Sequence, residues 1–196
     1  MSRAAQMSRN TKETSIVASL EVDGSGKFAI STMVPFFDHM LGQLAKHSGC
    51  DIEVAATGDI EVDAHHLIED VGIVLGGLLR EALGDKVGIA RFSSVAIPLD
   101  EALVDVALDL SGRAFLYYDV DTANLAPLGS PAMDPQLAEE FFRAFCNAAG
   151  ICMHIELRRG VNGHHIIEAT FKAVARAIGE AKAVVGSGVP STKGVL

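Results

Sequence analysis

The chain contains an internal repeat, and this repeat limits the possible folds more than any other feature of the sequence. The segment HHLIEDVGIVLGGLLREALG, which starts at His65, matches HHIIEATFKAVARAIGEAKA, which starts at His164, with His, His and Glu in the same places. Upstream, the helical pattern FFDHMLGQLAKHSG (from Phe36) corresponds to LAEEFFRAFCNAAG (from Leu137), and both run through a glycine into a β-like stretch. Matches in a shared order indicate that one structural unit has been duplicated.

A third pair of matching segments lies before these helices. SLEVDGSGKFAIST (from Ser19) and VALDLSGRAFLYYD (from Val106) each alternate apolar and polar residues around a Ser-Gly pair that precedes a cation. This pattern is typical of a β-hairpin. Each half is therefore predicted to contain a hairpin, a helix, a strand, a short loop and a long helix. The halves span roughly residues 15–100 and 101–196 of one domain, 1–196.

Apolar residues recur at intervals of three and four along both long segments, as expected for helices that bury one stripe. The stripes are Leu67, Val71, Val74, Leu78 and Ala82, and Ile167, Phe171, Val174, Ile178, Ala181 and Val185. The predicted fold class is α+β, with internally duplicated halves, each a small β-sheet with two helices, and with the sheets covering a central helix layer. The proline-rich stretch 121–136 is predicted to be a surface loop that joins the halves.

Composition excludes several classes of function. The net charge is −9 and no lysine- or arginine-rich run is present, which argues against a nucleic-acid partner. The longest apolar run, Val71–Leu79, is too short to cross a membrane, and the first residues lack the apolar region of a secretory signal. Three cysteines without a Cys-x-x-Cys pair indicate a reducing compartment. We expect a soluble cytoplasmic protein.

The two His-His-x-x-Glu motifs suggest metal binding. On a helix the glutamate lies on the same side as both histidines, because residues three and four apart are neighbours. Adjacent histidines point about 100° apart around the helix axis, so each pair is expected to serve two different ions. Ligands from the other half, or from another subunit, would complete each site. Imidazoles combined with carboxylates suit Mn, Fe, Co or Zn, whereas Ca and Mg prefer oxygen ligands.

Each half also offers one upstream candidate ligand. His39 and Glu140 occupy corresponding positions in the matching upstream segments, and both side chains can bind a metal. The glutamate is the weaker of the two candidates, because acidic residues are common in the first turn of a helix. The predicted metal ligands for two ions per subunit are His39, His65, His66, Glu69, Glu140, His164, His165 and Glu168.

Several motifs together resemble the imidazoleglycerol-phosphate dehydratase family of histidine biosynthesis. They are RNTKET, FFDHMLGQLAKHSG, DAHHLIEDVGIVLG, GIARFSSVAIPLDEAL, LSGRAF, GVNGHHIIEATFKAVARAI and PSTKGVL, and they extend from about Arg9 to Leu196. The resemblance implies a metal-dependent hydro-lyase, that is, a carbon–oxygen lyase. Its substrate would be D-erythro-imidazole glycerol phosphate and its product imidazole acetol phosphate. Some relatives carry a fused phosphatase domain, for which this chain has no room, so the monofunctional form is expected.

The resemblance also assigns roles to residues. It implies two Mn(II) ions per subunit that bind the substrate as imidazolate, and it matches the ligands given above, although some members carry histidine at the position of Glu140. Glu13 matches a glutamate near the reacting carbons and is the candidate catalytic base. The candidate substrate-binding residues are Glu13, His47, Arg91, Arg113, Ser191, Thr192 and Lys193. Family members assemble into an octahedral homo-oligomer, a 24-mer, with active sites at subunit contacts.

Two other classes fit parts of the pattern. A metal-storage bundle would need four long helices with Glu-x-x-His pairs, but strand-like segments occupy much of each half. A metal hydrolase would show one His-x-x-x-His pair and a single ion. Removal of metal by a chelator separates these classes, because a dehydratase should lose its activity and regain it with Mn(II).

Overall fold

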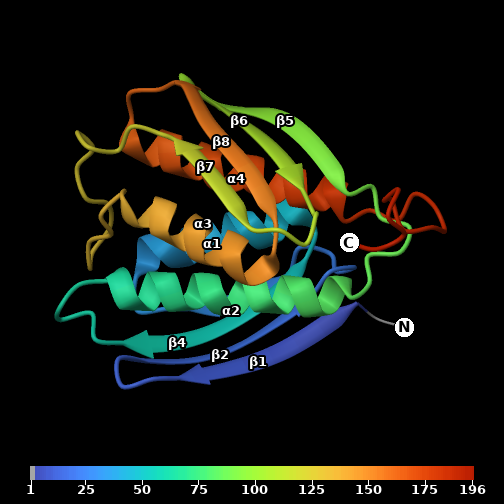
Figure 1. The fold of residues 1–196 in the computed structure, drawn as a ribbon. Coiled ribbons are helices and arrows are strands. Elements are labelled where there is room, and N and C mark those ends of the chain that lie inside the picture. The colour runs from blue at the N-terminus through green and yellow to red at the C-terminus, as the bar shows by residue number, and fades with distance from the viewer. Residues whose placement is uncertain (1–2) are drawn as a thin grey trace.

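The computed structural model describes residues 3–196 and shows two β-sheets that enclose a double layer of helices (Figure 1). The first half contains β1 (Ala4–Asn10), β2 (Thr14–Glu21), β3 (Phe28–Ser31), α1 (Pro35–Ser48), β4 (Asp51–Gly58) and α2 (His65–Leu83). The second half contains β5 (Phe92–Leu99), β6 (Ala102–Asp109), β7 (Phe115–Asp119), α3 (Leu137–Ala149), β8 (Cys152–Arg159) and α4 (Gly163–Ala181). The order of elements is the same in both halves.

The two sheets also share one topology. Their strand orders are β1-β2-β4-β3 and β5-β6-β8-β7. Neighbouring strands are antiparallel except β3 with β4 and β7 with β8, which are parallel. This arrangement confirms the predicted α+β fold with duplicated halves. Because β5 is the counterpart of β1, the boundary between the halves falls between α2 and β5, before the position near residue 100 that the sequence suggested.

The predicted hairpins at the Ser-Gly turns are wrong. These turns connect β2 to β3 and β6 to β7, but β4 and β8 lie between the connected strands. The reason is that β3, α1 and β4 form a parallel β-α-β unit, whose crossover helix returns the chain beside β3. Local alternation identifies a strand but not its partner. The true hairpins are β1–β2 and β5–β6, and their tips carry Glu13 and Glu101.

The hydrophobic core lies between the sheets and the helices. Helix α2 packs on β1 and β2, helix α4 packs on β5 and β6, and the two helix layers meet where α1 contacts α4 and α2 contacts α3. The predicted stripes are buried as expected; Leu67, Val71 and Phe171, for example, have no exposed area. Val185 is the exception, since it lies beyond the end of α4 and is exposed. Within residues 3–196, no helix combines the length and apolarity of a membrane span.

Small residues bring α2 and α3 unusually close together. A Cβ atom placed on Gly72 would lie 2.7 Å from the carbonyl oxygen of Phe141 and 3.1 Å from the Cβ of Ala144. Both neighbours belong to α3 and are a backbone atom or a Cβ, so neither can move without moving the helix. Gly72 therefore sets the spacing of the two helices that carry His65 and Glu140.

The loop 121–136 lies between β7 and α3. It contains no helix or strand, as predicted, but it belongs to the second half and does not join the halves. Thr122, Pro131 and Asp134 from this loop line a cavity of about 530 Å³ together with His65 and Glu140. The loop is thus part of the surroundings of a predicted ligand pair.

Candidate metal and substrate-binding site

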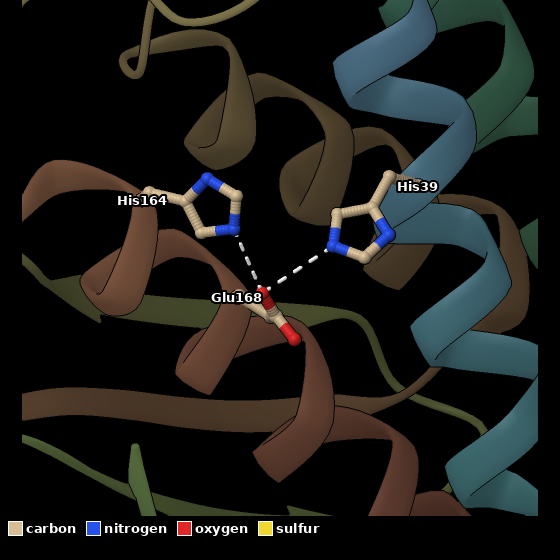
Figure 2. A group of neighbouring side chains, drawn as sticks. All are labelled: His39, His164 and Glu168. Carbon is tan, nitrogen blue, oxygen red and sulfur yellow. Dashed lines mark hydrogen bonds and ion pairs between the residues drawn. The ribbon is translucent and has the colours of Figure 1, made fainter. Parts of the chain in front are cut away.

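The structure brings three of the predicted metal ligands together where α1 of the first half meets α4 of the second. His39 from α1 and His164 from the first turn of α4 both direct Nε2 at one oxygen of Glu168, as Figure 2 shows. The distances from Glu168 Oε2 are 3.3 Å to His39 Nε2 and 2.9 Å to His164 Nε2. One donor atom from each of the three side chains lies within 4.8 Å of the others.

Glu168 is held in its charged form at this position. Its side chain is only 11% exposed, and burial by itself raises the pKa of a carboxyl group. The hydrogen bond and charge of Lys172, whose Nζ lies 2.6 Å from Glu168 Oε1, lower the pKa below its ordinary value on balance, with further help from His164 and His39. Lys172 thus leaves Oε2 as the oxygen that faces the two imidazoles.

The equivalent group between α2 and α3 is less compact. His65 Nε2 lies 4.0 Å from Glu69 Oε2, and Glu140 lines the same cavity as His65. Glu140 has Arg143 as its ion-pair partner, with 3.9 Å between Oε2 and Nε. The two groups are equivalent, because α2 and α3 take the places here that α4 and α1 have in the other group. The side chains of His65, Glu69 and Glu140, however, do not converge on one point.

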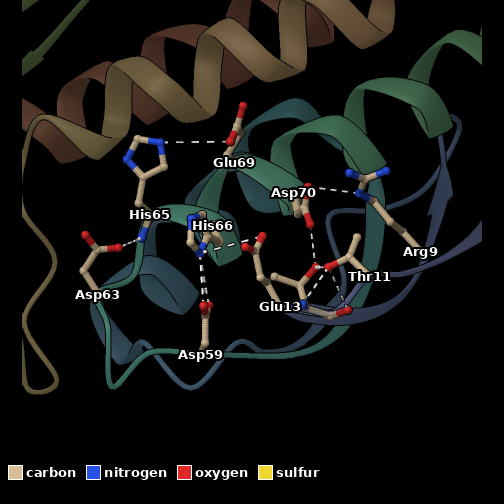
Figure 3. Close-up of polar contacts among 10 residues, drawn as sticks. Arg9, Thr11, Glu13, Asp59, Asp63, His65, His66, Glu69 and Asp70 are labelled. Carbon is tan, nitrogen blue, oxygen red and sulfur yellow. Dashed lines mark hydrogen bonds and ion pairs between the residues drawn. The ribbon is translucent and has the colours of Figure 1, made fainter.

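The second histidine of each motif faces a different direction from the first. Figure 3 shows His65 directed toward Glu69 and His66 directed toward the tip of the β1–β2 hairpin. His66 Nδ1 lies 3.1 Å from Asp59 Oδ2 and 3.9 Å from Glu13 Oε2. The ring planes of His65 and His66 are 78° apart. One helix therefore presents its two imidazoles to two separate places, as the sequence predicted.

His165 repeats this arrangement in the second half. Its Nδ1 lies 2.7 Å from Glu101 Oε2, at the tip of the β5–β6 hairpin, and its Nε2 lies 3.8 Å from Asp100 Oδ2. The hydrogen bond from His165, together with backbone N–H donors from Asn162 and Val161, lowers the pKa of Glu101 to about 2. In turn the hydrogen bond to Glu101 raises the pKa of His165, and the hydrogen bond to Asp59 raises that of His66.

The hairpin tip that carries Glu13 is firmly attached to α2 (Figure 3). The Thr11 hydroxyl accepts hydrogen bonds from the backbone N–H groups of Glu13 and Thr14. Buried Asp70, the residue after Glu69, accepts hydrogen bonds from the Thr14 hydroxyl and from Arg9 Nε. The Glu13 carboxylate itself is 55% exposed and has His66 as its nearest ionic partner. A fixed backbone thus carries an acid group that is open to solvent.

His47 lies on the same face of α1 as His39, two turns further along. Its Nε2 is 3.2 Å from Gln43 Oε1, and Gln43 in turn lies 3.5 Å from His39 Nδ1. Burial lowers the pKa of His47, and the positive charges of Lys172 and Arg176 lower it further. His47 is therefore a neutral imidazole at neutral pH, on the side of the helix that faces α4.

The predicted phosphate-binding residues form one group of their own. They line a cavity of about 860 Å³ between the Ser-Gly turn after β6 and the C-terminal segment, and they are Arg91, Arg113, Ser191, Thr192 and Lys193. Arg91 is already engaged: Nε and Nη2 donate to the Asp109 carboxylate at 2.7 and 3.1 Å, and Nη1 donates to the Pro190 carbonyl at 2.7 Å. It anchors the C-terminal segment that brings Lys193 into the cavity.

The phosphate-binding group and the histidine groups lie at opposite ends of the molecule. Arg91 donates its backbone N–H to the carbonyl of Ala181, the last residue of α4, whereas His164 is near the first. At 1.5 Å per residue these ends are about 25 Å apart. In Figure 1 the C-terminal segment lies beside the end of α4 and the start of β5. One small ligand cannot reach both groups in a single copy.

The donor atoms at the histidine groups fit a divalent transition-metal ion. Two imidazole nitrogens and one carboxylate oxygen converge between α1 and α4, a mixture typical of Mn, Fe, Co or Zn sites. Glu13, Asp59 and His66 form a second group of three within the same separation. There the carboxylate nearest the imidazole, Asp59, faces Nδ1, so this contact is a hydrogen bond that leaves Nε2 of His66 available.

Sequence reasoning did not identify the carboxylates behind the histidines. Asp59 lies in the loop before α2, and Glu101 lies in the hairpin tip before β6. The only signal was the motif PLDEAL, which contains Glu101 and contributed to the family resemblance without a role for the residue. Asp70 was also missed, since an aspartate next to the apolar stripe of α2 gives no sign of a buried link to the Glu13 hairpin.

Comparison with known proteins gives a consistent result. The model of the family described as imidazoleglycerol-phosphate dehydratase matches residues 32–178. An imidazoleglycerol-phosphate dehydratase from Methanopyrus kandleri is 49% identical over 194 residues, which cover 99% of this chain and 96% of the relative. One from Acetivibrio thermocellus is 52% identical over 198 residues and covers both chains completely.

Solved structures agree with the sequence relatives. The crystal structure of imidazoleglycerol-phosphate dehydratase from Staphylococcus aureus aligns with a TM-score of 0.82 at 38% identity, covering 94% of this chain and 99% of the other. The Pyrococcus furiosus enzyme in complex with (S)-C348 aligns with a TM-score of 0.75 at 35% identity, covering 97% and 100%. With its duplicated fold, its paired histidine motifs and these matches, the chain belongs to the imidazoleglycerol-phosphate dehydratase family, whose members are hydro-lyases of histidine biosynthesis.

Proposed function

We propose that this member of the family dehydrates D-erythro-imidazole glycerol phosphate to imidazole acetol phosphate with two Mn(II) ions per subunit. The observation that carries the proposal is the convergence of His39, His164 and Glu168 on one point between α1 and α4. When bound, two such ions would hold the substrate ring as imidazolate, because a metal lowers the pKa of a bound group as it does that of water. The proposed ligands of the ions are His39, His65, His66, Glu69, Glu140, His164, His165 and Glu168.

Glu13 is the proposed base of the reaction. Dehydration removes the hydroxyl group from the carbon next to the ring and a proton from the following carbon, and the enol that results tautomerises to the ketone of the product. A proton acceptor therefore has to lie close to the ring. The Glu13 side chain is open to solvent and near His66, while its backbone is fixed by Thr11. A positioned carboxylate of this kind contributes about 10²–10⁴-fold to a proton transfer. Neutral His47 is proposed to contact the substrate from α1.

The phosphate is proposed to bind to a different copy of the chain. Arg91, Arg113 and Lys193 supply cationic donors and Ser191 and Thr192 supply hydroxyl and backbone donors, which together suit a phosphate group. They lie about 25 Å from the histidines of the same copy, by the length of α4. A complete site therefore needs a second subunit, which supports the proposal of an octahedral 24-mer with active sites at its subunit contacts.

Metal removal tests the first part of the proposal. Protein treated with a chelator should lose turnover of imidazole glycerol phosphate and regain it with Mn(II), and the restored enzyme should hold two ions per subunit. Turnover that persists in the metal-free protein, or one ion per subunit in the active enzyme, would contradict the proposal. Metal binding without any turnover would favour a storage role.

Mixed assemblies test the second part. The variants Glu168→Gln and Arg113→Ala should each be inactive, the first through the metal site and the second through the phosphate site. Assembly from an equal mixture should recover roughly a quarter of the wild-type activity. In such a mixture half of the metal groups and half of the phosphate groups are intact, and each shared site combines one of each at random. Separately assembled variants that are mixed afterwards are the control. No recovery in the mixed assembly would mean that each site is built from one copy.

A further inference from the structure

The tips of the two true hairpins carry glutamates at equivalent positions. Glu13 directly precedes β2 and Glu101 directly precedes β6, and these are matching strands of eight residues in the two halves. Each glutamate lies beside the second histidine of its half, His66 or His165. The duplication has therefore placed one carboxylate at the same point of both halves.

The two glutamates are engaged in different ways. Glu101 Oε2 accepts a hydrogen bond from His165 Nδ1 at 2.7 Å, and its Oε1 accepts the backbone N–H groups of Asn162 and Val161 at 2.9 and 3.2 Å. Glu13 instead lies 3.9 Å from His66 Nδ1. In the first half it is Asp59 that takes the hydrogen bond from this nitrogen, at 3.1 Å.

A β-bulge explains why the second half uses the hairpin glutamate. Leu103 and Val104 pair with Arg159 and Leu157, whereas the equivalent Ser15 and Ile16 pair with Thr57 and Ala56, so β8 has one extra residue. Gly160 therefore takes the place of Gly58, and each packs against the third residue of the following His-His motif, Ile166 or Leu67. Val161 then stands in the place of Asp59 and has no carboxylate, so Glu101 is the carboxylate that reaches His165.

The hydrogen bond decides which nitrogen of the ring is left for a metal. A carboxylate can only accept, so a proton lies on Nδ1 of His165 and the lone pair of the neutral ring is on Nε2. Among residues 3–196, no hydrogen bond is made to this Nε2; the nearest charged atom is Asp100 Oδ2 at 3.8 Å. An imidazole held by a carboxylate at one nitrogen and open at the other is the usual form of a metal-binding histidine.

We propose that Glu101 is a positioning residue that fixes the ring orientation and tautomer of His165, so that Nε2 faces a divalent cation. Asp59 positions the ring of His66 in the same way, so Glu13 is available to accept a proton. The proposal rests on the proposed metal binding by the paired histidines. It adds that the two equivalent glutamates have different roles: Glu101 orients the metal ligand His165, and Glu13 accepts a proton from the substrate.

The variant Glu101→Gln tests this role. Glutamine keeps the shape of the side chain, and its carbonyl oxygen can still accept the N–H groups of Val161 and Asn162. Its NH₂ group then faces His165 Nδ1 and donates to it, which moves the ring proton to Nε2, where the cation should bind. We expect the affinity for Mn(II) to fall about 10–100-fold, measured by titration with the free Mn(II) signal in electron paramagnetic resonance.

Two further measurements separate positioning from folding. The melting temperature of the metal-free variant should equal that of the metal-free wild type, and saturating Mn(II) should restore most of the turnover. Glu81→Gln is the matched control, because it removes the same charge from an exposed site in the last turn of α2 and should leave Mn(II) affinity unchanged.

Unchanged Mn(II) affinity in Glu101→Gln would overturn the positioning role while leaving the proposed function standing. So would a lower melting temperature of the metal-free variant with no change in Mn(II) affinity. Failure of the wild-type protein itself to bind Mn(II) would instead overturn the proposed function, and the positioning role with it.

Discussion

Replacement of Gly72 by alanine should destabilise the protein and change the position of Glu140 relative to His65 and Glu69. The new methyl group would lie 2.7 Å from the Phe141 carbonyl oxygen and 3.1 Å from Ala144 Cβ, roughly 0.5–1 Å short of ordinary contact. Overpacking of this kind costs about 1–3 kcal/mol, while alanine in place of glycine in a helix gains about 1 kcal/mol. The expected net loss is up to about 2 kcal/mol.

Gly77→Ala is the control on the same helix. Its Cβ atom would meet only the end of the Met7 side chain, at 3.1 Å from Cε, which can rotate away, so the helix gain of about 0.5–1 kcal/mol should remain. Urea unfolding of the metal-free proteins, followed by circular dichroism at one protein concentration, measures both changes. A Gly72→Ala protein as stable as Gly77→Ala would refute the claim that a close backbone contact fixes the spacing of α2 and α3.

Three further predictions concern charged groups. Glu13→Gln should lower the turnover number at least about 100-fold and leave the melting temperature unchanged, because its side chain is 55% exposed; a loss of stability instead would point to a structural role. Glu140→Ala should reduce the metal content of the assembly toward one ion per subunit if this carboxylate is a ligand, and two ions in the variant would remove it from the ligand set. Backbone N–H groups of Lys27 and Ser25 lower the pKa of Asp51 below its ordinary value of 3.8. The ionised Asp51 carboxylate therefore stabilises the folded protein above that pH, and this stabilisation is lost as the pH falls toward the lowered pKa. Urea midpoints measured across this acid range should therefore fall less steeply in Asp51→Asn than in the wild type, and parallel curves would contradict the assignment.

The repeat, the buried stripes and the fold class could be predicted from the sequence because each is encoded by the spacing of residues along the chain. Strand pairing could not. The alternation around Gly26 and Gly112 identifies strands on both sides of each turn, but the insertion of β4 and β8 between them depends on the crossover helices. The preceding strands β1 and β5 were not predicted, since both lie at sheet edges and alternate between exposed and half-buried residues without a fully buried, apolar face.

The candidate ligands were predictable for a similar reason and their surroundings were not. His39, His164 and Glu168 were candidates because they lie in repeated motifs, but they meet because α1 packs beside α4, a pairing of helices that the sequence did not predict. Asp59 and Glu101 reach the histidines from a loop and a hairpin tip, whose positions depend on the whole sheet. The separation of about 25 Å between the ends of α4 became visible only when Arg91 was found bonded to Ala181.

The carboxylates beside the second histidines also limit how the two halves can evolve. In the first half a histidine has two carboxylates within reach, Asp59 and Glu13, so one can take another role while the other keeps the ring in place. In the second half Val161 takes the place of Asp59, and Glu101 is the carboxylate that holds Nδ1 of His165. A mutation of Glu101 should therefore be tolerated only together with a second change that supplies an acceptor for this nitrogen, so positions 101 and 161 should show epistasis.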